Sequence, residues 1–406
     1  TARQAYSQQD TILAKQYFKR ANSLSIAAEY DSAIFYYKKA SIIFGKTAAS
    51  FYQSGNGGGK APSQVLGTDI RGTRLWAKKV LCLSKTGWNY MLAADYKKAE
   101  EYQNRAIQTG LKQLGKDHYF VATSYNALGE IYRYTGKYDA AMECYEKALK
   151  IVIKLFGEKH GGVAACYNNL GIVYEDQGDY YTALEFYHQA LRIKSSFYGP
   201  TDLSLSSTLN NIGSTHYHMR EFDKAYEYFN RSLNIKLKKL GEFHPETAYL
   251  YNNIGNVLAE KGNYHKAFEL YDKALQTQLS FFGENHPEVA MSYSNIGAAY
   301  MDKREFDKAM RFFNKALVID LYIFGKKHPA VSVDYQEFGK LFWRRNNFNK
   351  ALQYYQKAIN SLVLDFDSNN IYVNPILVNI NSKIELLDTL TEKAELFENK
   401  WKKGNE

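Results

Sequence analysis

The sequence has few prolines, few cysteines and no long apolar run, and each shortage excludes a class of protein. Six prolines among 406 residues permit long uninterrupted helices, because proline breaks the interior of a helix. Three cysteines (Cys82, Cys144 and Cys166) without a Cys-x-x-Cys pair make no disulfide framework and are expected to be buried thiols. No apolar run approaches the roughly 18 residues of a membrane-spanning helix, so we expect a soluble protein.

Aromatic residues, in contrast, are abundant, with 35 tyrosines and 23 phenylalanines. They belong to an internal repeat whose clearest marker is a glycine that recurs every 42 residues. We call these the repeat glycines: Gly129, Gly171, Gly213, Gly255, Gly297 and Gly339, with Gly87 one step upstream. Such a period predicts a stack of similar units rather than a single compact core.

The other recurring residues of each unit are spaced as on a helix. Each repeat glycine is followed by a ring, an alanine, in most units a second ring, and then a small residue, in steps of three or four after the first ring. Steps of three and four keep residues on one face of a helix. A short polar turn such as Gln177-Gly178-Asp179 separates the glycine-bearing helix, helix A, from the alanine-bearing helix B. Each unit is therefore predicted to be a helical hairpin that stacks on its neighbours.

These residues resemble the tetratricopeptide repeat. The stretch YNNLGIVYEDQGDYYTALEFYHQALRI and the connecting segment GENHPEVA are similar to the 42-residue form found in kinesin light chains. A looser similarity is to the tetratricopeptide regions that precede caspase-like CHAT protease domains in bacterial proteins. The resemblance implies an all-α fold: a right-handed superhelix, or α-solenoid, of about eight hairpins with a C-terminal capping helix.

The period also predicts the domain boundaries. We expect a disordered N-terminus over 1–9, a flexible insertion loop over 45–70 and a C-terminal helix over 372–404, with repeats at 10–44, 71–116, 117–158, 159–200, 201–242, 243–284, 285–326 and 327–366. The insertion contains a glycine-rich run that ends in Lys60. A phosphate-binding loop would need Ser or Thr after that lysine, whereas Ala61 follows, so no nucleotide or other cofactor is expected.

The histidines His118, His160, His244, His286 and His328 follow the same period. Equivalent residues of stacked helices lie roughly 8–10 Å apart, too far to share one metal ion. His-Pro pairs are instead expected to mark the start of helix A. No nucleophile–base arrangement can be nominated either, so the sequence predicts neither a metal site nor a catalytic site, and we expect a non-enzyme.

Asparagines give the sharpest functional indication. Asn169, Asn211, Asn253 and Asn295 each stand two residues before a repeat glycine; we call them the amide row. In similar tetratricopeptide proteins this position faces a concave groove, where a side-chain amide can pair with a peptide backbone of any sequence. The preceding asparagines Asn168, Asn210 and Asn252 are equally periodic, so some amides could bond neighbouring turns instead. Further groove candidates, four or five residues after the glycine, are Arg133, Tyr217, His218, Trp343 and Arg344.

The sequence thus favours a scaffold that binds a protein or peptide partner in its groove. One alternative is a regulatory segment that controls an effector such as a caspase-like protease, in cis or in trans. A weaker one is nucleic-acid binding, because the net charge of +10 is concentrated near both ends of the chain. A monomer in the cytoplasm is the expected state, with export as the alternative if a signal peptide was removed before Gln8.

Overall fold

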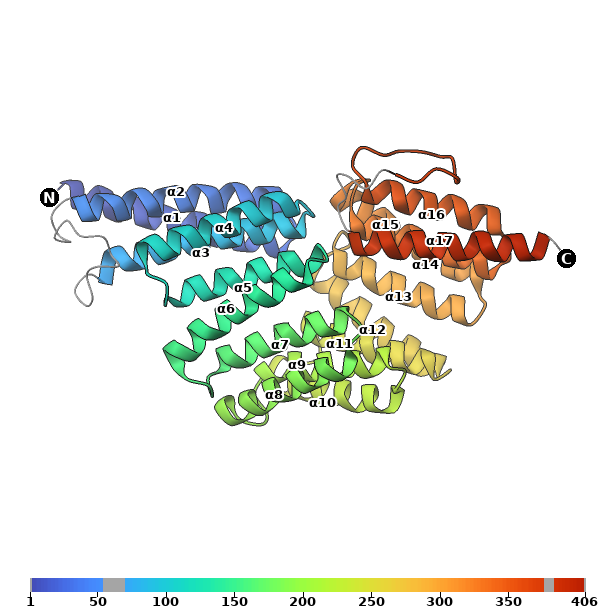
Figure 1. Cartoon of the computed structure of the whole chain (residues 1–406). Coiled ribbons are helices and arrows are strands. Elements are labelled where there is room, and N and C mark those ends of the chain that lie inside the picture. The colour runs from blue at the N-terminus through green and yellow to red at the C-terminus, as the bar shows by residue number, and fades with distance from the viewer. Residues whose placement is uncertain (1, 54–69, 376–382, 405–406) are drawn as a thin grey trace. The chain divides into compact units, whose positions relative to one another are not determined.

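The computed structural model describes residues 2–53, 70–375 and 383–404, and those residues form seventeen α-helices (Figure 1). The chain divides into two compact units, Thr1–Asp179 and Tyr180–Glu406. The first unit contains α1 (Ala2–Ile26), α2 (Tyr30–Gln53), α3 (Ile70–Leu92), α4 (Tyr96–Gln113), α5 (Tyr119–Tyr134), α6 (Tyr138–Phe156) and α7 (Gly161–Asp176). The second contains α8 (Tyr180–Tyr198), α9 (Ser204–His218), α10 (Phe222–Leu240), α11 (Pro245–Glu260), α12 (Tyr264–Phe282), α13 (Pro287–Asp302), α14 (Phe306–Phe324), α15 (Pro329–Arg344), α16 (Phe348–Leu362) and α17 (Lys383–Gly404).

Within each unit the helices stack in chain order. Successive helices pack against one another, as α2 does with α3 and α10 with α11. The A helices also touch the A helices of the next repeat, α3 with α5 and α11 with α13. The first unit thus contains the hairpins α1–α2, α3–α4 and α5–α6, and the second contains α9–α10, α11–α12, α13–α14 and α15–α16 with α17 as an additional helix. This repeated packing confirms the predicted α-solenoid fold.

The interior of each hairpin depends on the repeat glycine. A Cβ atom at Gly255 of α11 would lie 2.6 Å from the ring of Tyr271 in α12, so only glycine lets the ring approach. The same relation joins Gly129 to Tyr145 at 2.7 Å and Gly297 to Phe313 at 2.7 Å. These rings are almost completely buried, as are the alanines one turn before them. The predicted role of the glycines in close helix approach is therefore confirmed.

The choice between tyrosine and phenylalanine at this ring follows a local rule in several hairpins. The hydroxyl of Tyr145 donates to Glu130, 2.9 Å away, and that of Tyr271 donates to Asn256 at 2.7 Å. Both acceptors stand directly after the repeat glycine. Where that position is Ala298, the ring is Phe313, which needs no acceptor. A buried hydroxyl without a partner would destabilise the fold, so in these three hairpins the ring and the residue after the glycine are matched.

Histidines begin five of the A helices. Each accepts a hydrogen bond at Nδ1 from the backbone N–H two residues later: His118, His160, His244, His286 and His328. Three of their rings also stack on the phenylalanine that ends the preceding B helix, with ring centroids 3.8 Å apart for His286 and Phe282. These histidines therefore satisfy helix N-termini, as the predicted structural role requires.

Three predicted boundaries differ from the structure. The N-terminal segment 1–9 is not disordered throughout, since α1 begins at Ala2. Residues 45–53 are helical rather than part of a loop, because α2 continues to Gln53 and buries Ala48 in the same cluster as Leu75 of α3. The rest of the predicted insertion, 54–69, lies outside the described residues.

The C-terminal helix was predicted to begin at residue 372, but residues 372–375 are not helical; the described helix α17 spans Lys383–Gly404. Pro375 explains part of this difference, because proline disfavours helical backbone at the residue before it. The helix α17 packs on α15 and α16 and buries Leu386 and Leu396. None of the described helices combines the length and the apolar character that crossing a bilayer requires.

Candidate peptide-binding face

Each A helix presents two neighbouring rows of residues, and in α11 and α15 the amide of the earlier row is buried, whereas Asn126, Asn168 and Asn210 of that row are half-buried. The earlier row consists of the residues that stand three positions before each repeat glycine, and it lies between repeats. Asn252 is fully buried and donates to Ser292 of the next repeat at 2.8 Å, and Gln336 donates to Thr389 of α17 at 2.6 Å. Asn126 contacts the thiol of Cys166 in the same way. Asn126, Asn252 and Gln336 therefore hold neighbouring helices together.

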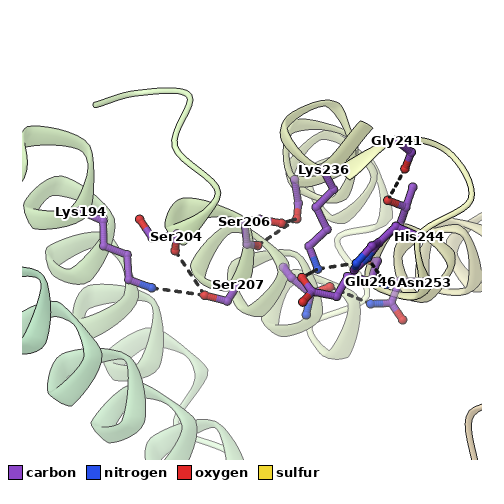
Figure 2. Close-up of polar contacts among 12 residues, drawn as sticks. Lys194, Ser204, Ser206, Ser207, Lys236, Gly241, His244, Glu246 and Asn253 are labelled. Carbon is purple, nitrogen blue, oxygen red and sulfur yellow. Dashed lines mark hydrogen bonds and ion pairs between the residues drawn. The ribbon is translucent and has the colours of Figure 1, made fainter. Parts of the chain in front are cut away.

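The amide row itself is half-buried rather than enclosed. Asn169 and Asn295 form no hydrogen bond with other residues of the described ranges. Asn253 donates to Asn210 of the preceding repeat at 2.8 Å, a contact drawn in Figure 2, and its carbonyl oxygen is not used in that bond. Asn211 also has an interaction partner. Two members of the row are thus committed within the protein, and two are available.

Arg133, a groove candidate in the first unit, is held by two carboxylates. Its guanidinium group lies 2.8 Å from Glu130 and 2.7 Å from Asp176 of the next repeat, and its side chain is only 13% exposed. Burial alone would lower its pKa, but Glu130 and Asp176 raise the pKa above its usual value. Arg133 therefore serves first as a link between repeats.

Tyr217 and His218 lie at the C-terminal end of α9. The hydroxyl of Tyr217 donates to Glu260 of the next repeat at 3.5 Å, and burial followed by Glu260 raises its pKa to about 12. His218 is exposed and stacks on Tyr180, with the ring centroids 6.2 Å apart. Glu260 also lies 3.6 Å from Arg220. The half-buried tyrosine links two repeats, whereas the histidine is accessible.

Trp343 and Arg344 occupy the equivalent end of α15. Trp343 is half-buried against the core that includes Leu341 and Tyr355, so only part of its ring is accessible. Arg344 lies 2.5 Å from Asp302 of the preceding repeat, and its side chain remains 50% exposed. Position four after the glycine thus faces the neighbouring helices, and position five is the more accessible of the two.

Polar contacts that were not predicted from the sequence join several B helices to the A helix that follows each of them. Lys194 of α8 is buried and donates to Thr208 of α9 at 2.8 Å; Figure 2 shows its further contact with Ser207. Two periods later Gln278 accepts a hydrogen bond from Ser292. We call these contacts the repeat junctions. Their signal was present in the sequence as polar residues recurring at an otherwise buried position.

The third such junction consists of two acids. Asp320 of α14 and Asp334 of α15 are both more than nine-tenths buried, and each carboxyl group shifts the pKa of the other. Burial raises the pKa of Asp320 to about 7, and burial together with Asp320 raises that of Asp334 to about 9. The pair therefore holds a proton at neutral pH, since two buried carboxylates in contact repel each other.

The described residues contain no cluster of three or more metal-ligating side chains. All three cysteines are buried, and burial raises the pKa of the Cys82 thiol to about 12 and those of Cys144 and Cys166 to about 11. Thiols with such pKa values are protonated and unreactive at neutral pH. The geometry therefore offers side-chain amides, ion pairs and rings for recognition.

The fold and the periodic face define a class of protein, and comparison with known proteins agrees. The tetratricopeptide repeat family matches residues 89–154, 141–196, 162–238, 203–260 and 246–321, which together span more than half of the chain. The chain belongs to this family. No curated protein matches the sequence.

Two solved structures show the same fold at low sequence identity. The apo form of the quorum sensor NprR from B. thuringiensis is 16% identical, with a TM-score of 0.56 over 86% of this chain and 88% of that one. The Rap conjugation gene regulator of plasmid pLS20, in complex with the Phr* peptide, is 13% identical, with a TM-score of 0.57 over 87% and 94%. A kinesin light chain repeat protein from Podosopora anserina is 19% identical, with a TM-score of 0.42 over 49% and 94%.

Proposed function

We propose that this protein is an interaction scaffold that binds an extended segment of a partner polypeptide along its A helices. The observation that carries the proposal is the amide row. In the second unit, Asn211, Asn253 and Asn295 stand at equivalent, half-buried places on α9, α11 and α13. A row of amides one repeat apart offers alternating donors and acceptors, which suits the backbone of an extended peptide whatever its side chains.

The neighbouring side chains would add selectivity. His218, Glu260, Asp302 and Arg344 follow the amide row two turns later along the A helices, on the same helical face. Glu260 and Asp302 are each only about one-third exposed and each faces an arginine. A bound peptide with charges of both signs could exchange partners with these ion pairs. We therefore expect a mixed-charge segment rather than a purely acidic or basic one.

Two solved structures support binding by this fold. One regulator of similar fold is described in complex with the Phr* peptide, and another is described as a quorum sensor. At 13% and 16% identity the likeness concerns the fold, so the partner of this chain has to be found by experiment. Control of a caspase-like effector remains the alternative, and no contact in the described residues favours it over a general scaffold.

The test starts by using the intact chain to capture a partner and mapping the captured segment with synthetic peptides. The mapped peptide is then titrated against wild type and Asn253→Ala/Asn295→Ala. Each lost hydrogen bond should weaken binding by about 1 kcal/mol, so the double variant should lose roughly tenfold or more in affinity.

A matched control removes two asparagines from B helices instead. Asn230 of α10 and Asn314 of α14 lie away from the amide row, so Asn230→Ala/Asn314→Ala should bind as wild type does. Circular dichroism checks that both variants keep their helicity. Equal affinity of wild type and Asn253→Ala/Asn295→Ala would remove the amide row from the account. Capture of RNA or DNA with a steep salt dependence would replace the proposal by nucleic-acid binding.

A further inference from the structure

One corner between repeats departs from the others. The A helices α5, α7, α11, α13 and α15 each begin directly after a histidine that accepts a backbone hydrogen bond. At α9 the equivalent residue is Asp202, which accepts a hydrogen bond from Ser204 N at 2.9 Å, and the helix begins one residue later in its repeat. Tyr198 occupies the repeat position at which Phe282 stacks on His286. No histidine is present at this corner to cover the Tyr198 ring, which is 45% exposed.

A surface pocket of about 740 Å³ lies at this corner, between α8, α9 and α10. We call it the corner pocket. Pro200 and Thr201 of the connecting segment line one side of it, in place of the histidine-capped turn of the other corners. The volume falls within the roughly 300–1,000 Å³ typical of ligand sites.

The floor of the corner pocket is aliphatic. Leu205 and Leu209 of α9 and Ile235 of α10 form a small buried cluster, with the partly buried Leu191 of α8 packed against it. Leu205 and Leu209 stand one turn apart near the N-terminal end of α9. Tyr217 and His218 are at the other end of that helix, so the floor is separate from the face described above.

The rim is basic. Arg192, Arg231, Lys238 and Lys239 surround the floor, and all four are exposed. In the parts of the chain that the structure describes, Arg192, Lys238 and Lys239 form no ion pair. Arg231 lies 3.8 Å from Glu227, an exposed pair one helical turn apart that contributes little.

Asp202, which interacts with Lys239, is the other acid at the corner. Two acids against four basic groups leave the rim positively charged. A lysine-rich surface that only faces solvent would not need an apolar floor beneath it. A basic rim around an aliphatic floor therefore suits a ligand that has both an acidic part and an apolar part.

We propose that the corner pocket is a second binding site, which takes an acidic polypeptide segment carrying one aliphatic side chain. The aliphatic side chain would cover Leu205, Leu209 and Ile235, and flanking carboxylates would lie against Lys238, Lys239 and Arg192. Single-stranded nucleic acid fits less well, because its recognition relies on aromatic rings that stack on bases, and the floor offers leucine and isoleucine. This site goes beyond the proposed peptide-binding face and does not depend on it.

The test uses the full chain and a short fluorescein-labelled peptide in which one leucine is flanked by glutamates and aspartates. Binding is followed by fluorescence anisotropy. Lys238→Glu/Lys239→Glu should weaken binding at least about tenfold, because it turns attraction on the rim into repulsion. Lys266→Glu/Arg311→Glu is the matched control: it reverses two equally exposed charges on α12 and α14 and should change affinity less than about twofold.

A second variant tests the floor without changing charge. Ser195 of α8 lines the pocket, so Ser195→Trp should fill it and weaken the same peptide by a similar factor. Replacing the leucine of the probe by serine should also weaken binding to wild type. Asn253→Ala/Asn295→Ala should leave the affinity for this probe unchanged, since those residues lie outside the pocket.

Several outcomes overturn the proposal. They are no binding of the probe to wild type, an equal loss in the control Lys266→Glu/Arg311→Glu, or full binding by both pocket variants. Displacement of the probe by oligouridylate at comparable affinity, with the same sensitivity to Lys238→Glu/Lys239→Glu, would assign the pocket to nucleic acid instead.

Discussion

Inside the hairpins, the glycine–ring contact recurs with little change: the ring of Phe229 would lie 2.7 Å from a Cβ at Gly213, and that of Phe313 would lie 2.7 Å from one at Gly297. The repeat junctions, in contrast, differ from one another. The junction of α8 and α9 joins a lysine to a threonine, that of α12 and α13 joins a glutamine to a serine, and that of α14 and α15 joins two acids. Constant apolar contacts build each hairpin, and individual polar contacts join one hairpin to the next.

This difference has a physical reason. The interior of a hairpin can have the same residues in successive repeats, because the same apolar side chains pack together in each of them. A buried polar group is tolerated only beside its own partner, so a junction residue fits one neighbour and fails beside another. We therefore infer that the junctions specify the order in which hairpins stack, while the interiors supply most of the stability.

The largest effect should come from emptying a hairpin interior. Phe313→Ala removes a ring that is 1% exposed and should cost about 3–5 kcal/mol of unfolding free energy. Ser292→Ala at a junction should cost less, because each of the two neutral hydrogen bonds that Ser292 forms, with Asn252 and with Gln278, contributes about 0.5–1.5 kcal/mol. Urea unfolding followed by circular dichroism measures both. A larger loss for Ser292→Ala than for Phe313→Ala would reverse the comparison.

The next effect comes from overfilling the same interior. Gly255→Ala places a methyl group 2.6 Å from the ring of Tyr271 and should cost about 1–3 kcal/mol. Lys266→Ala, on the exposed face of α12, controls for an alanine that meets no ring. Wild-type stability of Gly255→Ala in urea would show that the ring can move aside and that the glycine is dispensable.

The acidic junction should make stability depend on pH. Asp320 and Asp334 have pKa values of about 7 and about 9 when folded, above the roughly 3.9 of an unfolded aspartate. The folded state thus keeps protons that the unfolded state releases, and stability should fall as pH rises from about 4 to about 9. Asp334→Asn should flatten this decline in thermal melts.

The control at that junction is Asp307→Asn, which changes an exposed aspartate of α14. It should leave the decline in melting temperature with pH in place. A wild-type melting temperature that rises steadily between pH 5 and pH 9 would contradict the shared proton.

The smallest effect concerns a helix start. Burial lowers the pKa of His118, and its neutral ring accepts the hydrogen bond from Phe120 N. Its contribution is therefore present above the unfolded pKa of about 6.5 and lost as pH falls below it. His118→Asn keeps an acceptor at acid pH, so it should match wild type at pH 8 and exceed it at pH 5 by about 1 kcal/mol. If wild type and His118→Asn were equally stable at pH 8 and also at pH 5, the protonation of His118 would have no effect on this helix start.

The sequence predicted the hairpins well because their determinants are local and periodic. The glycine and ring represented by Gly255 and Tyr271 stand at the same offset in most repeats, so their contact could be anticipated. The ends of the array were predicted less well. The added length of α2 depends on its packing against α3, and no 42-residue pattern encodes that contact.

The candidate face was predicted only in part. Which of two adjacent asparagines is buried depends on the rotation of the whole helix, and Asn252 and Asn253 differ by one position. The ion pairs of Arg133 and Arg344 join residues 42 or 43 positions apart, so sequence spacing gave their position but not their partners. The corner pocket had a visible sign, Asp202 in place of a histidine, whose consequence depends on how α8, α9 and α10 meet.

The helix α17 has a consequence for assembly. It takes the place that a further A helix would occupy beside α15, with Gln336 bonded to Thr389 and Lys340 facing Glu392 at 3.5 Å. Stacked repeats grow by offering an open apolar end to the next hairpin, and two copies of such a chain could join head to tail into a filament. With Leu386 and Leu396 seated on that end, another copy could add there only after α17 had detached. One helix thus covers the apolar surface of α15 and α16 that a further hairpin would otherwise need for stacking.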